Sequence, residues 1–187
     1  MQLRRILIGI ALLPLLATCG GSGPFTVNGN IRGSGMSSGD AISSVGAIRL
    51  DSTPLNAAVV VLSNSSGLCS AAGASKQPKN SKFLLFVIND RTTSTGTPGP
   101  GTYTIWSGSG TPPTKFSFAQ YFQTDATCQE TQLTVGLTGT VTITSVNNGD
   151  VSGNFDFTFD SNDHVTGSFS AKNCNALISA LGNSTCG

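Results

Sequence analysis

The chain has 187 residues, of which 38% are hydrophobic and only 10% are charged. Ten Lys and Arg residues stand against nine Asp and Glu residues, so the formal net charge is +1 at pH 7. Nucleic acid binding requires a concentrated basic face, which excludes nucleic acid as a partner for so neutral a chain. Abundant Ser, Thr, Asn and Gly in place of charge are common on exported β-proteins.

The first 19 residues have the pattern of an export signal. Arg4 and Arg5 precede an apolar run over 6–17, which is too short to span a membrane and is typical of a secretory signal core. The run ends in Leu16-Ala17-Thr18-Cys19, which resembles the lipobox of bacterial lipoproteins. This resemblance implies cleavage before Cys19 and attachment of a diacylglyceryl group to the cysteine. The alternative is an ordinary signal peptide that is cut elsewhere.

The resemblance also sets the domain boundaries and the location that we expect. Residues 1–18 would be the signal peptide, 19–24 the lipidated cysteine with a flexible tether, and 25–187 a single β domain. Loss of two arginines with the signal would leave eight basic against nine acidic residues, a net charge of −1. In this class, Gly20 in place of Asp after the cysteine favours the outer membrane of a Gram-negative cell. The expected protein is therefore exported and lipid-anchored.

The mature chain predicts short β-strands separated by frequent turns. Strand candidates, in chain order, are 25–31, 41–50, 56–62, 83–88, 101–107 and 115–123. Within them, the runs 57–62 and 83–88 are continuously apolar, which is typical of strands buried on both faces. A polar loop would span 63–81, and the only helix predicted after the signal covers 175–181. The pattern predicts an all-β fold, either an antiparallel sandwich or a curved barrel-like sheet.

The clearest pattern is a three-stranded meander over 133–171. Apolar and polar residues alternate in each strand, so one face would be buried and the other would meet water. The predicted core-facing set is Leu133, Val135, Leu137, Gly139, Val141, Ile143, Val151, Gly153, Phe155, Phe157, Phe159, Val165, Gly167, Phe169 and Ala171. Because directly opposite residues share a face, odd-numbered core positions should pair with odd-numbered ones.

The same parity fixes the turns and the register that we expect. It argues against a two-residue turn at Asn148-Gly149 and favours three-residue loops at 147–149 and 160–162. These loops place an aromatic ring opposite each core-facing glycine, an arrangement that is known to stabilise strand glycines. The predicted pairs are Gly139 with Phe157, Gly153 with Phe169, and Gly167 with Phe155.

Four cysteines remain besides Cys19, and an even number in an exported chain predicts two disulfides. An up-and-down strand order places Cys69 and Cys174 at one end of the sheet and Cys128 at the other. The helix after Cys174 would carry Cys186 back towards Cys128. We therefore favour Cys69–Cys174 with Cys128–Cys186, and the local pair Cys174–Cys186 is the alternative. The absence of CxxC spacing argues against zinc.

Two further features bear on binding or catalysis. Trp106 and Tyr121 would lie together outside the core if 101–107 and 115–123 form a hairpin, and paired aromatics can stack on sugar rings. The alternative is that a loop or a second layer covers them. The single histidine, His164, follows a predicted turn rich in aspartate, and turn chemistry explains it better than catalysis does.

These observations favour a non-catalytic, lipid-anchored β domain of the cell envelope with a structural or interaction role. Its partners would be the membrane, through the lipid, and an envelope glycan or protein. The first alternative is a carbohydrate- or envelope-polymer-binding module that uses Trp106 and Tyr121. A hydrolase that uses His164 and nearby aspartates ranks last, because no motif of a serine nucleophile accompanies them. The sequence predicts no cofactor.

Overall fold

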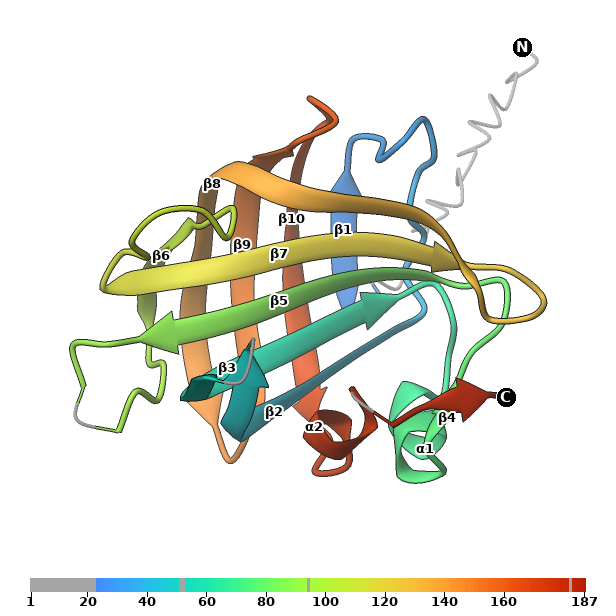
Figure 1. Cartoon of the computed structure of the whole chain (residues 1–187), viewed down its shortest axis with the longest axis horizontal. Helices are drawn as coiled ribbons and strands as arrows, with labels where there is room; N and C mark the ends of the chain where they lie inside the picture. Colours follow the sequence, from blue (N-terminus) through green and yellow to red (C-terminus); the bar gives the residue numbers. More distant parts are fainter. Residues whose placement is uncertain (1–22, 51–52, 94, 182) are drawn as a thin grey trace, which may run out of the picture.

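A computed structural model of the chain describes residues 23–50, 53–93, 95–181 and 183–187. The predicted signal peptide and Cys19 lie outside the described residues. The described part is mostly β, with a large mixed sheet of nine strands, a small two-stranded sheet and two short helices (Figure 1). This confirms the predicted all-β class, and each predicted strand is present with ends that differ by a few residues.

The strands and helices are, in chain order, β1 (Phe25–Asn28), β2 (Asp40–Leu50), β3 (Thr53–Ser63), α1 (Leu68–Gly73), β4 (Lys76–Gln77), β5 (Lys82–Asp90), β6 (Gly101–Ile105), β7 (Lys115–Thr124), β8 (Glu130–Asn147), β9 (Asp150–Phe159), β10 (His164–Asn173), α2 (Leu177–Ala180) and β11 (Thr185–Cys186).

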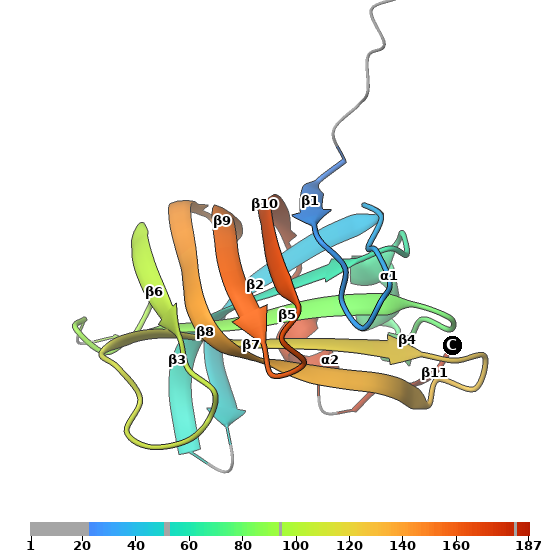
Figure 2. The ribbon, with the colours of Figure 1, turned by 90° about the horizontal axis from the view of Figure 1, so that it is seen from above.

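The large sheet is strongly curved (Figure 2). Antiparallel pairing runs from β2 through β3, β5, β7, β8 and β9 to β10. β10 then meets β2 through only two parallel pairs, Lys172 with Ile42 and Asn173 with Ser43. β1 pairs with the other part of β10, and β6 joins β8 and β7. Because the β10–β2 closure is so short, the sheet curls without forming a true barrel.

The inner face of this sheet holds the main hydrophobic core. Aromatic rings fill its centre: the Phe86 ring lies 5.4 Å from the Phe155 ring, and the Phe157 and Phe159 rings are 4.8 Å apart. Ile31, from the segment between β1 and β2, is fully buried in the same cluster. Side chains therefore fill the interior, as in other small curved sheets.

The meander of β8, β9 and β10 has the predicted core register. Gly139 lies opposite Phe157, and β10 places Phe169 opposite Gly153 and Gly167 opposite Phe155. A Cβ atom added at Gly167 would overlap the end of the Phe155 ring, so the ring occupies the space that the glycine leaves. The predicted loop 160–162 also forms, with Asn162 at a φ of 63°.

The first turn of the meander differs from the prediction. Asn147 pairs with Asp150, so Asn148 and Gly149 form a two-residue turn with φ values of 51° and 88°. Positive φ at both positions is the signature of the tight hairpin turn that Asn-Gly favours. The core register survives because the extra residue is a β-bulge between Ile143 and Ser145.

The start of β8 also differs from the prediction, because Leu133, Val135 and Leu137 face outwards. A bulge between Gly136 and Thr138 adds one residue, and a one-residue shift moves side chains to the other face. Thr134 is buried before the bulge, and Val141 is buried after it. As a result, Leu133 is 48% exposed and Leu137 is 46% exposed.

The helix α1 was not predicted, because it lies in the segment expected to be a polar loop. It is short, rich in small residues, and follows Gly67 without a side-chain cap from that residue. The carboxylate of Asp40, on β2, accepts a hydrogen bond of 3.0 Å from the backbone N–H of Leu68 instead. This tertiary contact satisfies an N–H of the first helical turn, which local sequence patterns cannot reveal.

Candidate binding site between the helices and the sheet

The outer face of the sheet is apolar along β2, β3, β5 and β7. Because β3 and β5 carry apolar residues on both faces, their outward side chains need a second layer to cover them. The helices α1 and α2 lie together at one end of the sheet and supply that layer (Figure 1). The resulting second cluster consists of Ile42, Val59, Val61, Leu68, Phe83, Cys174 and Leu177.

Two disulfides tie this second layer to the sheet. Cys69, on α1, is bonded to Cys174, which follows β10 and precedes α2. Cys128, in the loop between β7 and β8, is bonded to Cys186, on β11. Both favoured pairs are confirmed, and the alternative pair Cys174–Cys186 is wrong. A covalent link between distant segments restricts the unfolded chain and so stabilises the folded one.

A pocket of about 410 Å³ remains between the helices and the sheet. This volume falls in the range of about 300–1,000 Å³ that is usual for small-molecule sites. The sheet contributes mainly apolar side chains: Ile42, Val61, Phe83, Leu85, Gln120 and Phe122. The helices and the residue after α2 contribute Leu68, Ala71, Ala72, Leu177, Ala180 and Leu181. The remaining lining residues are Lys76, Gln77, Pro78, Glu130 and Ser184.

The small size of the helical side chains explains why the space is not filled. Ala71 and Ala72 on α1, and Ala180 on α2, line the pocket. An alanine side chain ends at Cβ and cannot reach across to the sheet. The pocket therefore follows from the composition of helices that sequence analysis alone did not bring together.

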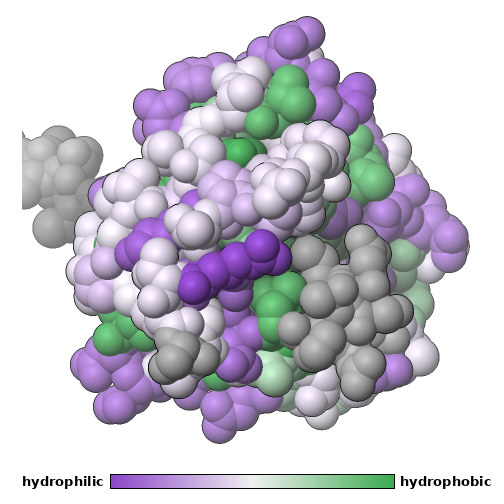
Figure 3. Space-filling view, turned by 60° about the vertical axis from the view of Figure 1, so that its left-hand side comes forward, coloured by the Kyte–Doolittle hydropathy of each residue, from purple (hydrophilic) through white to green (hydrophobic). Residues whose placement is uncertain are grey.

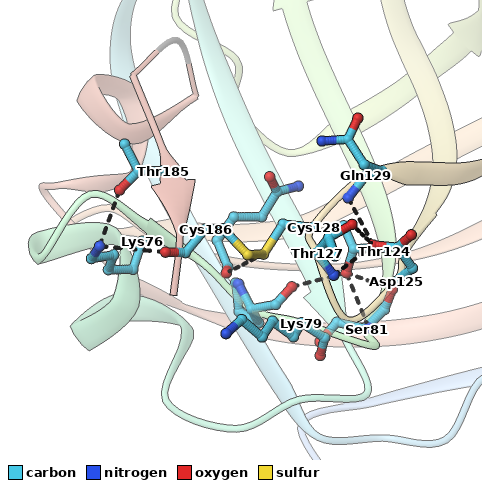
Figure 4. Close-up of a disulfide and its surroundings, with 12 residues drawn as sticks. Lys76, Lys79, Ser81, Thr124, Asp125, Thr127, Cys128, Gln129, Thr185 and Cys186 are labelled. Atoms are coloured by element: carbon cyan, nitrogen blue, oxygen red, sulfur yellow. Dashed lines mark hydrogen bonds between the residues drawn. A yellow bond between two sulfur atoms is a disulfide. The ribbon is translucent and has the colours of Figure 1, made fainter.

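The edge of the pocket is polar and carries both signs of charge. Lys76 and Glu130 are exposed lining residues of opposite charge. The Lys76 ammonium donates to Oγ1 of Thr185 at 3.1 Å and to the carbonyl of Cys186 at 3.4 Å (Figure 4). With one charge of each sign, this edge favours a neutral or amphipathic ligand over a strongly charged one.

The predicted aromatic pair does not form. Tyr121 is 0% exposed and packs in the inner core, with its ring 6.4 Å from that of Phe159. Trp106 packs instead on Phe116, at 5.4 Å, and its indole N–H donates to the carbonyl of Ser109. The two segments are not a hairpin, since β6 and β7 run parallel. The end of the molecule that carries β6 is mostly polar, with hydrophobic atoms in small separate groups (Figure 3).

His164 lies on the outer face of the meander. Its Nε2 atom is 2.8 Å from a carboxylate oxygen of Asp156 on the neighbouring strand, and the two side chains are 59% and 69% exposed. The Asp163 carboxylate accepts hydrogen bonds from the hydroxyl of Ser161 and the backbone N–H of Arg32 instead. Those hydrogen bonds, the Ser161 bond first, lower the pKa of Asp163. The arrangement completes a turn and leaves His164 in solvent.

One ion pair lies at the far end of β5 from the pocket. The Lys115 ammonium is 3.0 Å from the carboxylate of Asp90, whose side chain is buried. Burial alone would raise the pKa of Asp90, but hydrogen bonds from Thr92 and Lys115 outweigh it and lower the pKa. Burial raises the pKa of nearby Tyr103. The hydroxyl of Tyr103 donates to the carbonyl of Gly99, so this group fastens the loop after β5.

Comparisons with protein-family models, with curated proteins and with solved structures found no match. Within residues 23–50, 53–93, 95–181 and 183–187, no three His, Cys, Asp or Glu side chains gather closely enough to hold a metal ion. Neither helix in this part of the chain is long and apolar enough to cross a membrane. The pocket between the helices and the sheet is thus the feature from which a function can be argued.

Proposed function

We propose that the chain is a non-catalytic, exported domain that a lipid on Cys19 anchors to the outer membrane. In this proposal its role is interaction, and the binding site is the pocket between α1, α2 and the sheet. The observation that carries the proposal is an apolar pocket of about 410 Å³ held between two disulfide-linked layers. Most binding pockets for small ligands are apolar, with a few polar groups that set orientation.

The lining indicates the class of ligand. Val61, Leu85 and Phe122 offer an apolar floor that suits an acyl chain or an aromatic group. Gln77 and Gln120 offer amide donors and acceptors to a polar end of the ligand. A small amphipathic molecule of the envelope fits this lining better than a sugar polymer does, because the aromatic pair of Trp106 and Tyr121, which was expected to stack on sugar rings, does not form.

The binding proposal can be tested with the neutral apolar dye Nile red and the mature domain. We expect fluorescence enhancement with the wild type and its loss in Ala72→Leu, because the larger side chain would fill the pocket. Ala47→Leu is the matched control, since Ala47 is exposed on β2 and does not line the pocket. Equal dye binding by the two variants would remove the pocket from the proposal.

The anchor can be tested by metabolic labelling with a fatty acid. Wild-type chain should be labelled, and Cys19→Ser should not. Labelling of both proteins to the same extent would contradict the lipid anchor without affecting the pocket.

A further inference from the structure

We infer that the Cys128–Cys186 disulfide is a redox latch on the pocket. Reduction by a dithiol would release the segment Asn183–Gly187 from β4 and open one side of the site. The role in ligand binding rests on the proposed function, whereas the latch itself rests on where the disulfide lies and on the absence of residues 183–187 from both hydrophobic clusters.

The segment Asn183–Gly187 forms an edge of the pocket. Ser184 lines it directly, and so do Lys76 and Gln77 on β4. β11 pairs with β4 in parallel, with Thr185 opposite Lys76 and Cys186 opposite Gln77. Figure 4 shows the disulfide beside this contact, with Lys76 reaching to Thr185. Separation of the two strands would therefore widen access to the apolar floor.

Apart from the disulfide, hydrogen bonds hold this segment in place. All five of its residues are exposed, and none belongs to either hydrophobic cluster. The backbone N–H groups of Thr185 and Gly187 donate to the carbonyls of Ser75, at 2.9 Å, and Gln77, at 3.1 Å. The Lys76 ammonium donates to Thr185 and Cys186, and the Ser184 hydroxyl donates to the carbonyl of Ala180 at 2.7 Å. Segments with exposed hydrogen bonds and few apolar contacts open locally at low cost.

The other side of the latch is fastened independently of the disulfide. A carboxylate oxygen of Asp125 accepts hydrogen bonds from the backbone N–H groups of Thr127, at 2.7 Å, and Gln129, at 3.0 Å, which shape the loop that carries Cys128. The Thr124 hydroxyl donates to the carbonyl of Pro78 at 2.8 Å, which ties the chain after β4 to the sheet. Reduction should therefore move the Cys186 segment and leave the Cys128 loop and β4 in place.

A dithiol can attack either disulfide, since Cys69 and Cys186 are both exposed, so the cysteine that must leave decides which bond is reduced first. Cys186 is exposed and Cys128 is half-buried, so a dithiol can approach. Cys174 is 1% exposed and lies in the second apolar cluster, where a thiolate is disfavoured. If a dithiol attacked Cys69, Cys174 would have to leave as that disfavoured thiolate, which slows exchange.

The proposed step is thiol–disulfide exchange. A thiolate of the dithiol attacks the Cys186 sulfur, the bond to Cys128 breaks, and the Cys128 sulfur leaves as a thiolate and takes up a proton. The second thiol of the reductant then displaces Cys186 from the mixed disulfide. Two electrons pass to the protein, which gains two thiols, and the reductant becomes a disulfide.

The first experiment follows the disulfides and does not depend on any ligand. The mature domain is titrated with dithiothreitol, alkylated with iodoacetamide, and examined by mass spectrometry and hydrogen exchange. We expect alkylation of Cys128 and Cys186 at reductant concentrations that leave Cys69 and Cys174 bonded, together with faster exchange at 183–187 and unchanged exchange in the large sheet. Simultaneous reduction of both disulfides, or continued protection of 183–187, would overturn the latch.

The second experiment connects the latch to the pocket. Nile red should dissociate several-fold faster from Cys128→Ser/Cys186→Ser than from the wild type, while circular dichroism of the two proteins stays the same. Equal dissociation rates would overturn control of the pocket by the disulfide. If the wild type bound no dye at all, the proposed function would fail, and the alkylation and exchange results would decide the latch alone.

Discussion

The outer face of the meander and the outer face of β3 differ in what covers them. On β9, exposed Asn154 and Asp156 alternate with buried phenylalanines, so one face meets water. On β3, every residue from Ala57 to Ser63 is buried, because the core covers one face and the helices cover the other. Apolar and polar residues therefore alternate in the sequence only where one face of a strand is exposed to solvent.

The same contrast separates a framework from a binding region. The meander packs its rings against glycines and uses its outer face for solubility. The outer face of β2, β3, β5 and β7 is covered by a helical layer, which two disulfides link to the sheet. The alanines of this layer leave the pocket between the helices and the sheet. We expect substitutions in these two regions to have different effects on stability, and the following predictions test that difference.

The largest effect should come from the inner core of the meander. Phe157→Ala should lower the free energy of unfolding by about 3–5 kcal/mol, because it removes a buried ring and leaves a cavity. Phe157 is 1% exposed and its ring contacts three other rings, those of Phe86, Phe155 and Phe159. Urea denaturation measures the change. A loss of less than about 1 kcal/mol would show that the core is not closely packed around this ring.

The next effect should come from the disulfide that holds the helices. Cys69→Ser/Cys174→Ser should cost about 2–5 kcal/mol under oxidising conditions. Cys128→Ser/Cys186→Ser should lower the free energy of unfolding by less, because the β11–β4 pair beside this disulfide is largely exposed and contributes little to either hydrophobic cluster. Urea midpoints of the two double variants give the comparison. The reverse order would mean that the segment 183–187 contributes more to stability than the helical layer.

A matched pair of substitutions compares the two outer faces directly. Val59→Thr should cost about 1–3 kcal/mol, because Val59 lies under the helices and the hydroxyl would be buried there. Thr140→Val, on the outer face of β8, should change stability by no more than about 0.5 kcal/mol. Similar costs for the two variants would contradict the assignment of one covered face and one solvated face.

A pH titration tests the ion pair at the end of the covered strand β5. The pKa of Asp90 lies below its ordinary value of 3.8, so the ionised form stabilises the fold above that value. This contribution should disappear as the pH falls through the lowered pKa, because Asp90 is then protonated in both the folded and the unfolded chain. The stability difference between wild type and Asp90→Asn should therefore narrow in strongly acidic urea melts. A constant difference across pH would contradict the sign of the shift.

The smallest effect should come from the exposed face of β9. Asp156→Ala should cost well under about 1 kcal/mol, because only an exposed contact with His164 is lost. The test is to measure the free energies of unfolding of Asp156→Ala and Phe157→Ala side by side by urea denaturation. Equal damage from these neighbouring substitutions would show that a second layer or a partner covers the outer face of the meander.

The success of sequence reasoning followed the same division. The parity of the core positions predicted the core register of the meander, and the rings opposite Gly139, Gly153 and Gly167 agreed with it. Strand order predicted both disulfides. The bulge at Leu137 was missed, since an inserted residue in a Thr-rich strand leaves the apolar pattern unchanged. Tyr121 was misplaced because β7 carries aromatic residues on both faces, and the pocket was missed because its alanines lie far apart in the chain.

The two-pair closure between β10 and β2 has a consequence for the order of folding. It joins residues 42–43 to residues 172–173, whereas the hairpins within β2–β3 and β8–β10 are local. Closing a long loop costs more chain entropy than forming a hairpin, and non-local parallel contacts form slowly. We therefore expect the β2–β3 hairpin and the β8–β10 meander to form separately, and the β10–β2 contact, which we call the seam, to close last. The Cys69–Cys174 bond begins one residue beyond the seam, so oxidation there would trap the hairpin and the meander after they meet.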